Sequence, residues 1–159
     1  PKLGIYTSIA ILFYKFNLMG TYPGVIIIHL INSMMFMVWL PASAFRSVHT
    51  QQEEASRDVG AGPIRTFFKV SLPLAMPGIS VATLYTFLGS IEEGQGTMLV
   101  GLASVKTMPV ELYGVILDST ILQPGAVLSI LLMVPAGILI YALRKYIGPE
   151  AIAGGFKMK

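Results

Sequence analysis

The chain has 159 residues, of which 54% are hydrophobic and 12% are charged, with a formal net charge of +3 and no cysteine. Soluble domains usually carry about 25% charged residues, so this composition argues against a soluble domain. The absence of cysteine from the sequence excludes disulfides and thiolate metal sites within it. We therefore expect an all-α integral membrane protein.

The first apolar segment, Leu3–Tyr14, lies between Lys2 and Lys15. As a helix it offers only about 18 Å of uncharged length, which is less than a bilayer needs. We expect either a re-entrant helix or the end of a longer span. The sequence opens on Pro1, and we interpret it as a chain truncated at the N-terminus.

Three later segments are long enough to cross a membrane. Gly24–Phe45 and Val70–Ile91 each have 22 residues without a formal charge, and Ser119–Leu143 has 25. A helix of 22 residues is about 33 Å long, against a hydrocarbon core of about 30 Å. We predict about four spans with the first one partial. The helices of the last three are expected at about 22–46, from about 72 onward, and from about 124 to 143.

A polar loop lies between the spans Gly24–Phe45 and Val70–Ile91. The pattern predicts two short helices, at about 51–59 and 63–70, broken at Gly60-Ala61-Gly62-Pro63. Glycine commonly follows a helix C-terminus, and proline suits the first turn of the next helix. Beyond the third span, Met108–Leu117 is expected to form an amphipathic surface helix.

The charges are distributed unevenly between the connecting segments. Segment 46–69 and the tail 144–159 carry most of the basic residues, whereas 92–118 has one lysine against four acids. Under the positive-inside rule, the 46–69 loop and the C-terminus are cytoplasmic and 92–118 lies outside. The basic residues flank spans and form no single basic face, so we expect no nucleic-acid partner.

The first loop helix has a small face, formed by Ala55, Ser56 and Val59, and a rim of charged side chains. So short a helix is marginal in water and needs a surface to pack against. Two interpretations remain open from the residues alone. The helix either docks into a cleft on another protein or rests on its own membrane domain.

Polar residues at membrane depth are candidates for a translocation path. One group lies inside the second helix, and the other lies at the outer end of the third. The candidates are His29, Asn32, Ser33, Glu92, Glu93 and Gln95. The alternatives are hydrogen bonds between helices for the first group and interfacial charges for the second. We expect no metal site, because His29 has no second ligand at useful spacing.

The loop carries a spaced motif. Three residues separate Glu54-Ala55-Ser56 from Gly60, and nine residues separate Gly60 from Val70-Ser71-Leu72-Pro73. This pattern resembles the EAA loop (E-A-A-x3-G-x9-I-x-L-P) of binding-protein-dependent ABC importer permeases, with Ser56 and Val70 as conservative departures. The order of spans resembles the C-terminal part of maltose-type permease subunits. The tail Gly148–Lys159 looks like that of the same sugar-permease subfamily.

The resemblance implies one transmembrane permease domain over 1–159, with the type I ABC importer fold, a cytoplasmic coupling loop at 51–70 and a cytoplasmic tail at 144–159. It implies a dimer of ATP-binding subunits, a second permease subunit (identical or different), an extracytoplasmic substrate-binding protein and the inner-membrane bilayer as partners. ATP and Mg would be bound by the ATPase, and this chain would hold no cofactor and no catalytic residue. The implied coupling residues are Glu54, Ala55, Ser56, Val59, Gly60, Leu72 and Pro73.

The resemblance further implies a carbohydrate or polyol substrate. Ile91-Glu92-Glu93 drifts toward the acidic pattern of polyamine-type permeases, which is the alternative. An intramembrane enzyme is disfavoured, because the sequence lacks H-E-x-x-H, G-x-S-x-G and paired intramembrane aspartates. A secondary transporter without an ATPase remains a further alternative, although it has no reason to keep such a loop.

Overall fold

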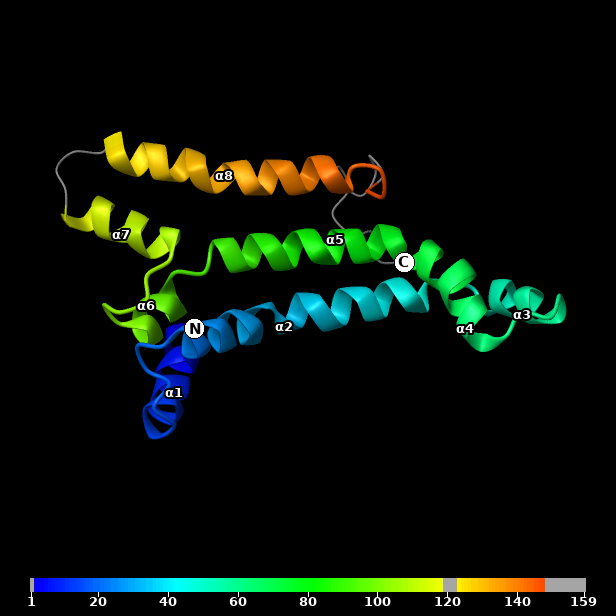
Figure 1. Ribbon diagram of the computed structural model, residues 1–159, viewed down its shortest axis with the longest axis horizontal. Coiled ribbons are helices and arrows are strands. Elements are labelled where there is room, and N and C mark those ends of the chain that lie inside the picture. Colours follow the sequence, from blue (N-terminus) through cyan, green and yellow to red (C-terminus); the bar gives the residue numbers. More distant parts are fainter. Residues whose placement is uncertain (1, 119–122, 148–159) are drawn as a thin grey trace. The chain divides into compact units, whose positions relative to one another are not determined.

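The computed structural model describes residues 2–118 and 123–147, which form helices and connecting loops with no strand among them (Figure 1). The described residues fall into two compact units. One lies within Pro1–Met34 and Phe87–Ile138, and the other within Met35–Thr86 and Leu139–Lys159. The long helices contribute to both units. Each unit is described below by itself.

The elements follow one another along the chain with short connections. They are α1 (Lys2–Lys15), α2 (Tyr22–Arg46), α3 (Thr50–Asp58), α4 (Pro63–Thr66), the π-helical turn η1 (Phe67–Ser71), α5 (Leu72–Ile91), α6 (Gln95–Gly101), α7 (Met108–Asp118) and α8 (Gln123–Leu143).

Three helical segments are long and apolar enough to cross a membrane: Tyr22–Arg46, Pro63–Ile91 and Gln123–Leu143. They correspond to the three full spans predicted from the uncharged runs. α1, with 14 residues, is about 21 Å long and cannot cross a hydrocarbon core of about 30 Å alone. Of the predicted tail at 144–159, residues 148–159 lie outside the described residues.

The join between loop and third span differs from the prediction. The second loop helix and the span were expected as separate helices, but Pro63–Ile91 is one continuous helical segment of 29 residues. Near its start lies the five-residue π turn, in which the Leu72 amide donates to the Phe67 carbonyl. The ring of Pro73 would clash with the carbonyl of Lys69 in a regular α-helix, and the wider turn relieves that clash.

The core of the first unit lies where α1, α2 and α6 meet. Its buried apolar side chains are Tyr6, Phe13, Ile28 and Val100. The Gly20 amide donates to the Val100 carbonyl over 2.8 Å, which ties the α1–α2 turn to α6. The helix α6 was not predicted from the sequence. It has seven residues, too few to show a periodic pattern, and it is held by this packing.

Candidate functional site

The loop helix α3 begins after His49 and ends at Asp58. The chain then reverses at Gly60, whose φ of +87° lies in the left-handed region that favours glycine. α4 starts at Pro63 in its first turn, where the missing N–H costs no hydrogen bond. These residues bring α3 back against α4 and η1.

Two side-chain contacts fasten α3 to the helix that follows. The Ser71 hydroxyl of η1 donates to the Glu53 carboxylate over 2.5 Å. The hydroxyls of Ser56 and Thr66 lie 3.2 Å apart. Thr66 and Ser71 are almost fully buried. α3 is therefore attached to the start of the membrane-spanning segment through one face.

The opposite face of α3 is open. Glu54 and Ala55 are exposed, and so is Val59, the residue directly after α3, which is 84% exposed. Of the predicted coupling residues within α3, only Ser56 turns inward, toward Thr66. The structure shows the contact with its own chain, whereas docking on another protein stays a prediction. The helix rests on its own chain through Glu53 and Ser56 and leaves a small, charged-rimmed face free.

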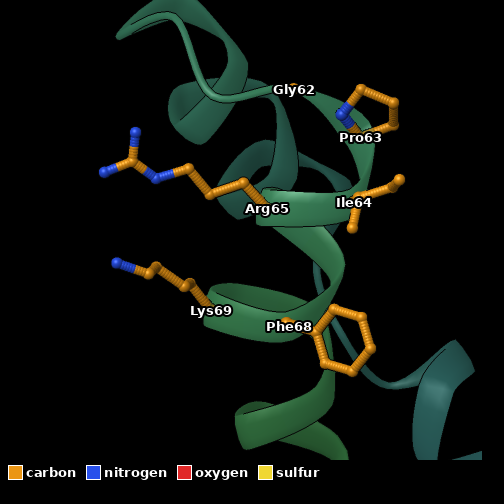
Figure 2. Close-up of a pocket in the computed structure, with 6 residues that line it drawn as sticks. All are labelled: Gly62, Pro63, Ile64, Arg65, Phe68 and Lys69. Carbon is orange, nitrogen blue, oxygen red and sulfur yellow. The ribbon is translucent and has the colours of Figure 1, made fainter.

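The remaining motif residues lie at the start of α5. Leu72 is half-buried and Pro73 is exposed. They follow the π turn directly, so the motif runs from the free face of α3, through Gly60, to the base of the span. Beside them is an open surface hollow with a volume of about 430 Å³, lined by Gly62, Pro63, Ile64, Arg65, Phe68 and Lys69 (Figure 2).

The predicted site residues that follow α5 differ in their exposure to solvent. Glu93 is 4% exposed. Its carboxylate accepts hydrogen bonds from the Tyr6 hydroxyl and the Gly96 amide, both over 2.6 Å. Glu92 and Gln95 are exposed on either side of it. Glu93 thus closes an internal contact, whereas its neighbours remain open to a ligand or partner.

The polar residues of α2 also make internal contacts. His29 Nδ1 lies 2.9 Å from the Ser90 hydroxyl, and Nε2 lies 2.9 Å from the Thr97 hydroxyl. The Asn32 amide donates to the Gly89 carbonyl over 3.5 Å, and Ser33 is buried. Both ring nitrogens of His29 are occupied, which favours hydrogen bonding between helices over path lining.

Sequence reasoning missed the partners of these residues. Tyr6 is 87 positions from Glu93, and Thr97 is 68 positions from His29, so no local pattern joins them. Ser71 stands at a variable position inside the motif, and its polarity between Val70 and Leu72 was the available signal. Among residues 2–118 and 123–147, no three His, Asp or Glu side chains gather to hold a metal ion.

Comparison with known proteins identifies the family. Residues 5–152 match the model of the family described as "Binding-protein-dependent transport system inner membrane component". The chain belongs to this family, which comprises membrane permease components of ABC importers that are generally non-catalytic. The predicted fold class, an all-α membrane protein of the type I importer kind, is confirmed. The chain is a multi-pass membrane protein.

Individual relatives transport different solutes, by their names. The chain is 35% identical over 88 residues to the diacetylchitobiose uptake system permease protein NgcG of Streptomyces coelicolor. It is 35% identical over 78 residues to the molybdenum transport system permease protein ModB of Escherichia coli K12. It is 32% identical over 117 residues to the spermidine/putrescine transport system permease protein PotC homolog of Mycoplasma genitalium.

These matches cover 54%, 49% and 71% of this chain, but only 29%, 34% and 41% of the respective relatives. The chain thus spans well under half the length of the curated relatives that it matches. The family and the membrane location follow from these comparisons, whereas the solute does not, because the three names differ in it.

Proposed function

We propose that the chain is part of the permease subunit of an ATP-driven ABC importer, in which α3 is the coupling helix that contacts the ATP-binding subunit. This proposal rests on one observation: α3 is attached to its own chain through one face and is exposed on the other. One face is fastened to the base of a membrane span by Glu53–Ser71 and Ser56–Thr66. The other presents Glu54, Ala55 and Val59 without a covering element of the described chain.

This arrangement suits the transmission of a rigid-body movement. A partner that pulls on α3 displaces Glu53 and Ser56, and these act on η1 and α4. Because Pro63–Ile91 is one continuous helical segment, the displacement reaches the other end of the span. Switching by rigid movement of packed elements is a recurrent mechanism in proteins. ATP and Mg bind to the partner, which supplies the free energy.

The remaining assembly follows the same proposal. The loop 46–69 and the tail 144–159 face the cytoplasm, as the basic residues indicate. A second permease subunit completes the path, and an extracytoplasmic binding protein delivers the solute. The partner permease is either a second copy or a different subunit.

We propose a carbohydrate or polyol as the solute, supported by the sequence resemblance to maltose-type permeases and by the likeness to a relative named for diacetylchitobiose uptake. A polyamine is the second candidate, favoured by the exposed carboxylate of Glu92. A relative named for spermidine and putrescine supports this alternative. A secondary transporter without an ATPase remains the candidate if no ATP-binding partner exists.

The test is co-purification in detergent of the full-length parent protein with the ATP-binding subunit encoded beside it. Glu54→Lys reverses a charge on the free face of α3, and Glu111→Lys makes the same change on the exposed surface of α7. The proposal expects association in the wild type and the α7 variant, and its loss in Glu54→Lys. Association that is equally strong in all three would move the contact away from α3. Absence of any ATP-binding partner would favour a secondary transporter.

A further inference from the structure

The first two turns of the segment that begins at Pro63 carry a basic stripe beside an apolar stripe. Arg65 and Lys69 are four residues apart and extend to the same side of the helix, as Figure 2 shows, whereas Ile64 and Phe68 extend to the other. Ile64 is 75% exposed and Phe68 is 61% exposed. All four line the surface hollow shown in Figure 2.

We propose that this hollow binds an anionic phospholipid of the bilayer. Its phosphate lies on Arg65 and Lys69, its glycerol part lies against Ile64 and Phe68, and its acyl chains extend from Phe68 toward the span. This lipid site depends on the membrane insertion of the chain and not on the coupling role of α3. Its failure and the failure of the proposed function are therefore distinguishable.

The level of the hollow in the bilayer supports a lipid as the occupant. The continuous segment Pro63–Ile91 has 29 residues, which corresponds to about 43 Å of helix. The hydrocarbon core is about 30 Å thick, and the bilayer with its headgroups is about 40–45 Å thick. Because the apolar run begins near Val70, the turns that contain Arg65 and Lys69 fall in the headgroup layer. Long basic side chains near a helix end extend toward that layer.

The charges at this level also favour an anion. Within residues 2–118 and 123–147, neither Arg65 nor Lys69 forms an ion pair, since the single pair found there joins Lys106 to Glu111. The ring of Phe45 stacks on that of Phe67 with centroids 5.8 Å apart. This stacking brings the basic end of α2, with Arg46, to the same level of the span.

The apolar stripe distinguishes a lipid from a free phosphate ion. Phosphate alone would need only the two cations, and it would leave Ile64 and Phe68 in water. Phe67 and Phe68 lie next to each other here, with ring centroids 5.2 Å apart, and add to the apolar surface beside the two cations. Anionic lipids are concentrated in the cytoplasmic leaflet, where the positive-inside rule puts this loop.

The test uses the full-length permease in detergent, titrated with dioleoylphosphatidylglycerol or dioleoylphosphatidylcholine, with bound lipid counted by native mass spectrometry. The wild type should bind the anionic lipid more tightly. Arg65→Gln/Lys69→Gln should lower that affinity about tenfold or more. Phe68→Ala, at an exposed position, should weaken it with both cations present. Lys2→Gln/Lys15→Gln makes the same charge change at the ends of α1 and should bind as the wild type does.

Three results would overturn the lipid site. The first is an unchanged preference for phosphatidylglycerol in Arg65→Gln/Lys69→Gln. The second is competition by inorganic phosphate as strong as that by the lipid, together with no effect of Phe68→Ala, which would indicate a simple anion site. The third is loss of the ATP-binding partner in Arg65→Gln/Lys69→Gln with lipid binding intact, which would assign the hollow to a protein interface.

Discussion

The Ser71 hydroxyl lies 2.5 Å from the carboxylate of Glu53, across the junction between the loop helix α3 and the π turn η1. The next residue along α3, Glu54, is exposed and makes no such contact. Adjacent residues on a helix point about 100° apart, so one glutamate of the pair turns inward and its neighbour turns outward. The two carboxylates therefore have separable roles: Glu53 attaches α3 to η1, and Glu54 is available to a partner.

Glu53→Ala and Glu54→Ala should have different effects. Glu53→Ala removes a hydrogen bond to a charged group and leaves the buried Ser71 hydroxyl without its acceptor, which should lower the free energy of unfolding by about 1–2 kcal/mol. Glu54→Ala should change it by less than about 0.5 kcal/mol, as for other surface positions. Thermal unfolding in detergent measures both. Equal melting temperatures for the two variants would contradict the attachment through Glu53.

Gly60 and Gly62 form a matched pair in the reversal between α3 and α4. A Cβ atom would meet no heavy atom within 4 Å at either position, but only Gly60 has a positive φ, at +87°. Gly60→Ala should destabilise the reversal by about 1–2 kcal/mol. Gly62→Ala should be neutral. The readout is the ratio of transported solute to hydrolysed ATP, which should fall in Gly60→Ala alone. A normal ratio in that variant would remove the reversal from the coupling path.

Gly96 is required by close packing. A Cβ there would lie 2.5 Å from the Cγ2 atom of Ile28, and 3.1 Å from the Glu93 carboxylate. Gly96→Ala should therefore cost about 1–3 kcal/mol through overpacking. Gly114→Ala, in the open on α7, should be tolerated. Comparison of the two melting temperatures tests the packing of α6, and an unchanged value for Gly96→Ala would contradict it.

The variants Glu92→Gln and Tyr6→Phe should distinguish a residue that recognises the solute from one that stabilises the fold. If the exposed Glu92 contacts the solute, Glu92→Gln should raise the uptake KM by roughly threefold to tenfold, as for a loss of about 1 kcal/mol. The melting temperature should stay the same. Tyr6→Phe withdraws one donor from the buried Glu93 carboxylate and should lower the melting temperature without changing solute selectivity. An uptake KM unchanged by Glu92→Gln would leave Glu92 as an interfacial charge.

The spans were predictable because their signal is local. Long uncharged runs indicate the spans, and the observed α2, Tyr22–Arg46, coincides with the prediction. The helix α6 was missed because seven residues cannot show a helical period, and it is held by contacts with α1. The family signal was local too, since the motif lies within 20 residues of one loop.

The internal contacts of the site were not predictable from the sequence. Glu92 and Glu93 look equivalent there, but Tyr6, from a helix 87 positions away, makes Glu93 an internal residue. His29 was predicted to line the path, but Ser90 and Thr97 lie within hydrogen-bond distance of its two ring nitrogens. The side chain that a buried polar group pairs with depends on which helices pack together, and residue spacing along the chain does not contain that information.

The most direct measurement is cross-linking from α3. The sequence contains no cysteine, so Val59→Cys can be labelled with a photoreactive maleimide in a full-length parent freed of other cysteines. Leu117→Cys on α7, at a residue that is also largely exposed, is the control. We expect a cross-link to the ATP-binding subunit from position 59 and none from position 117. A complex that forms normally but gives no cross-link from position 59 would contradict the role of α3 as the coupling helix.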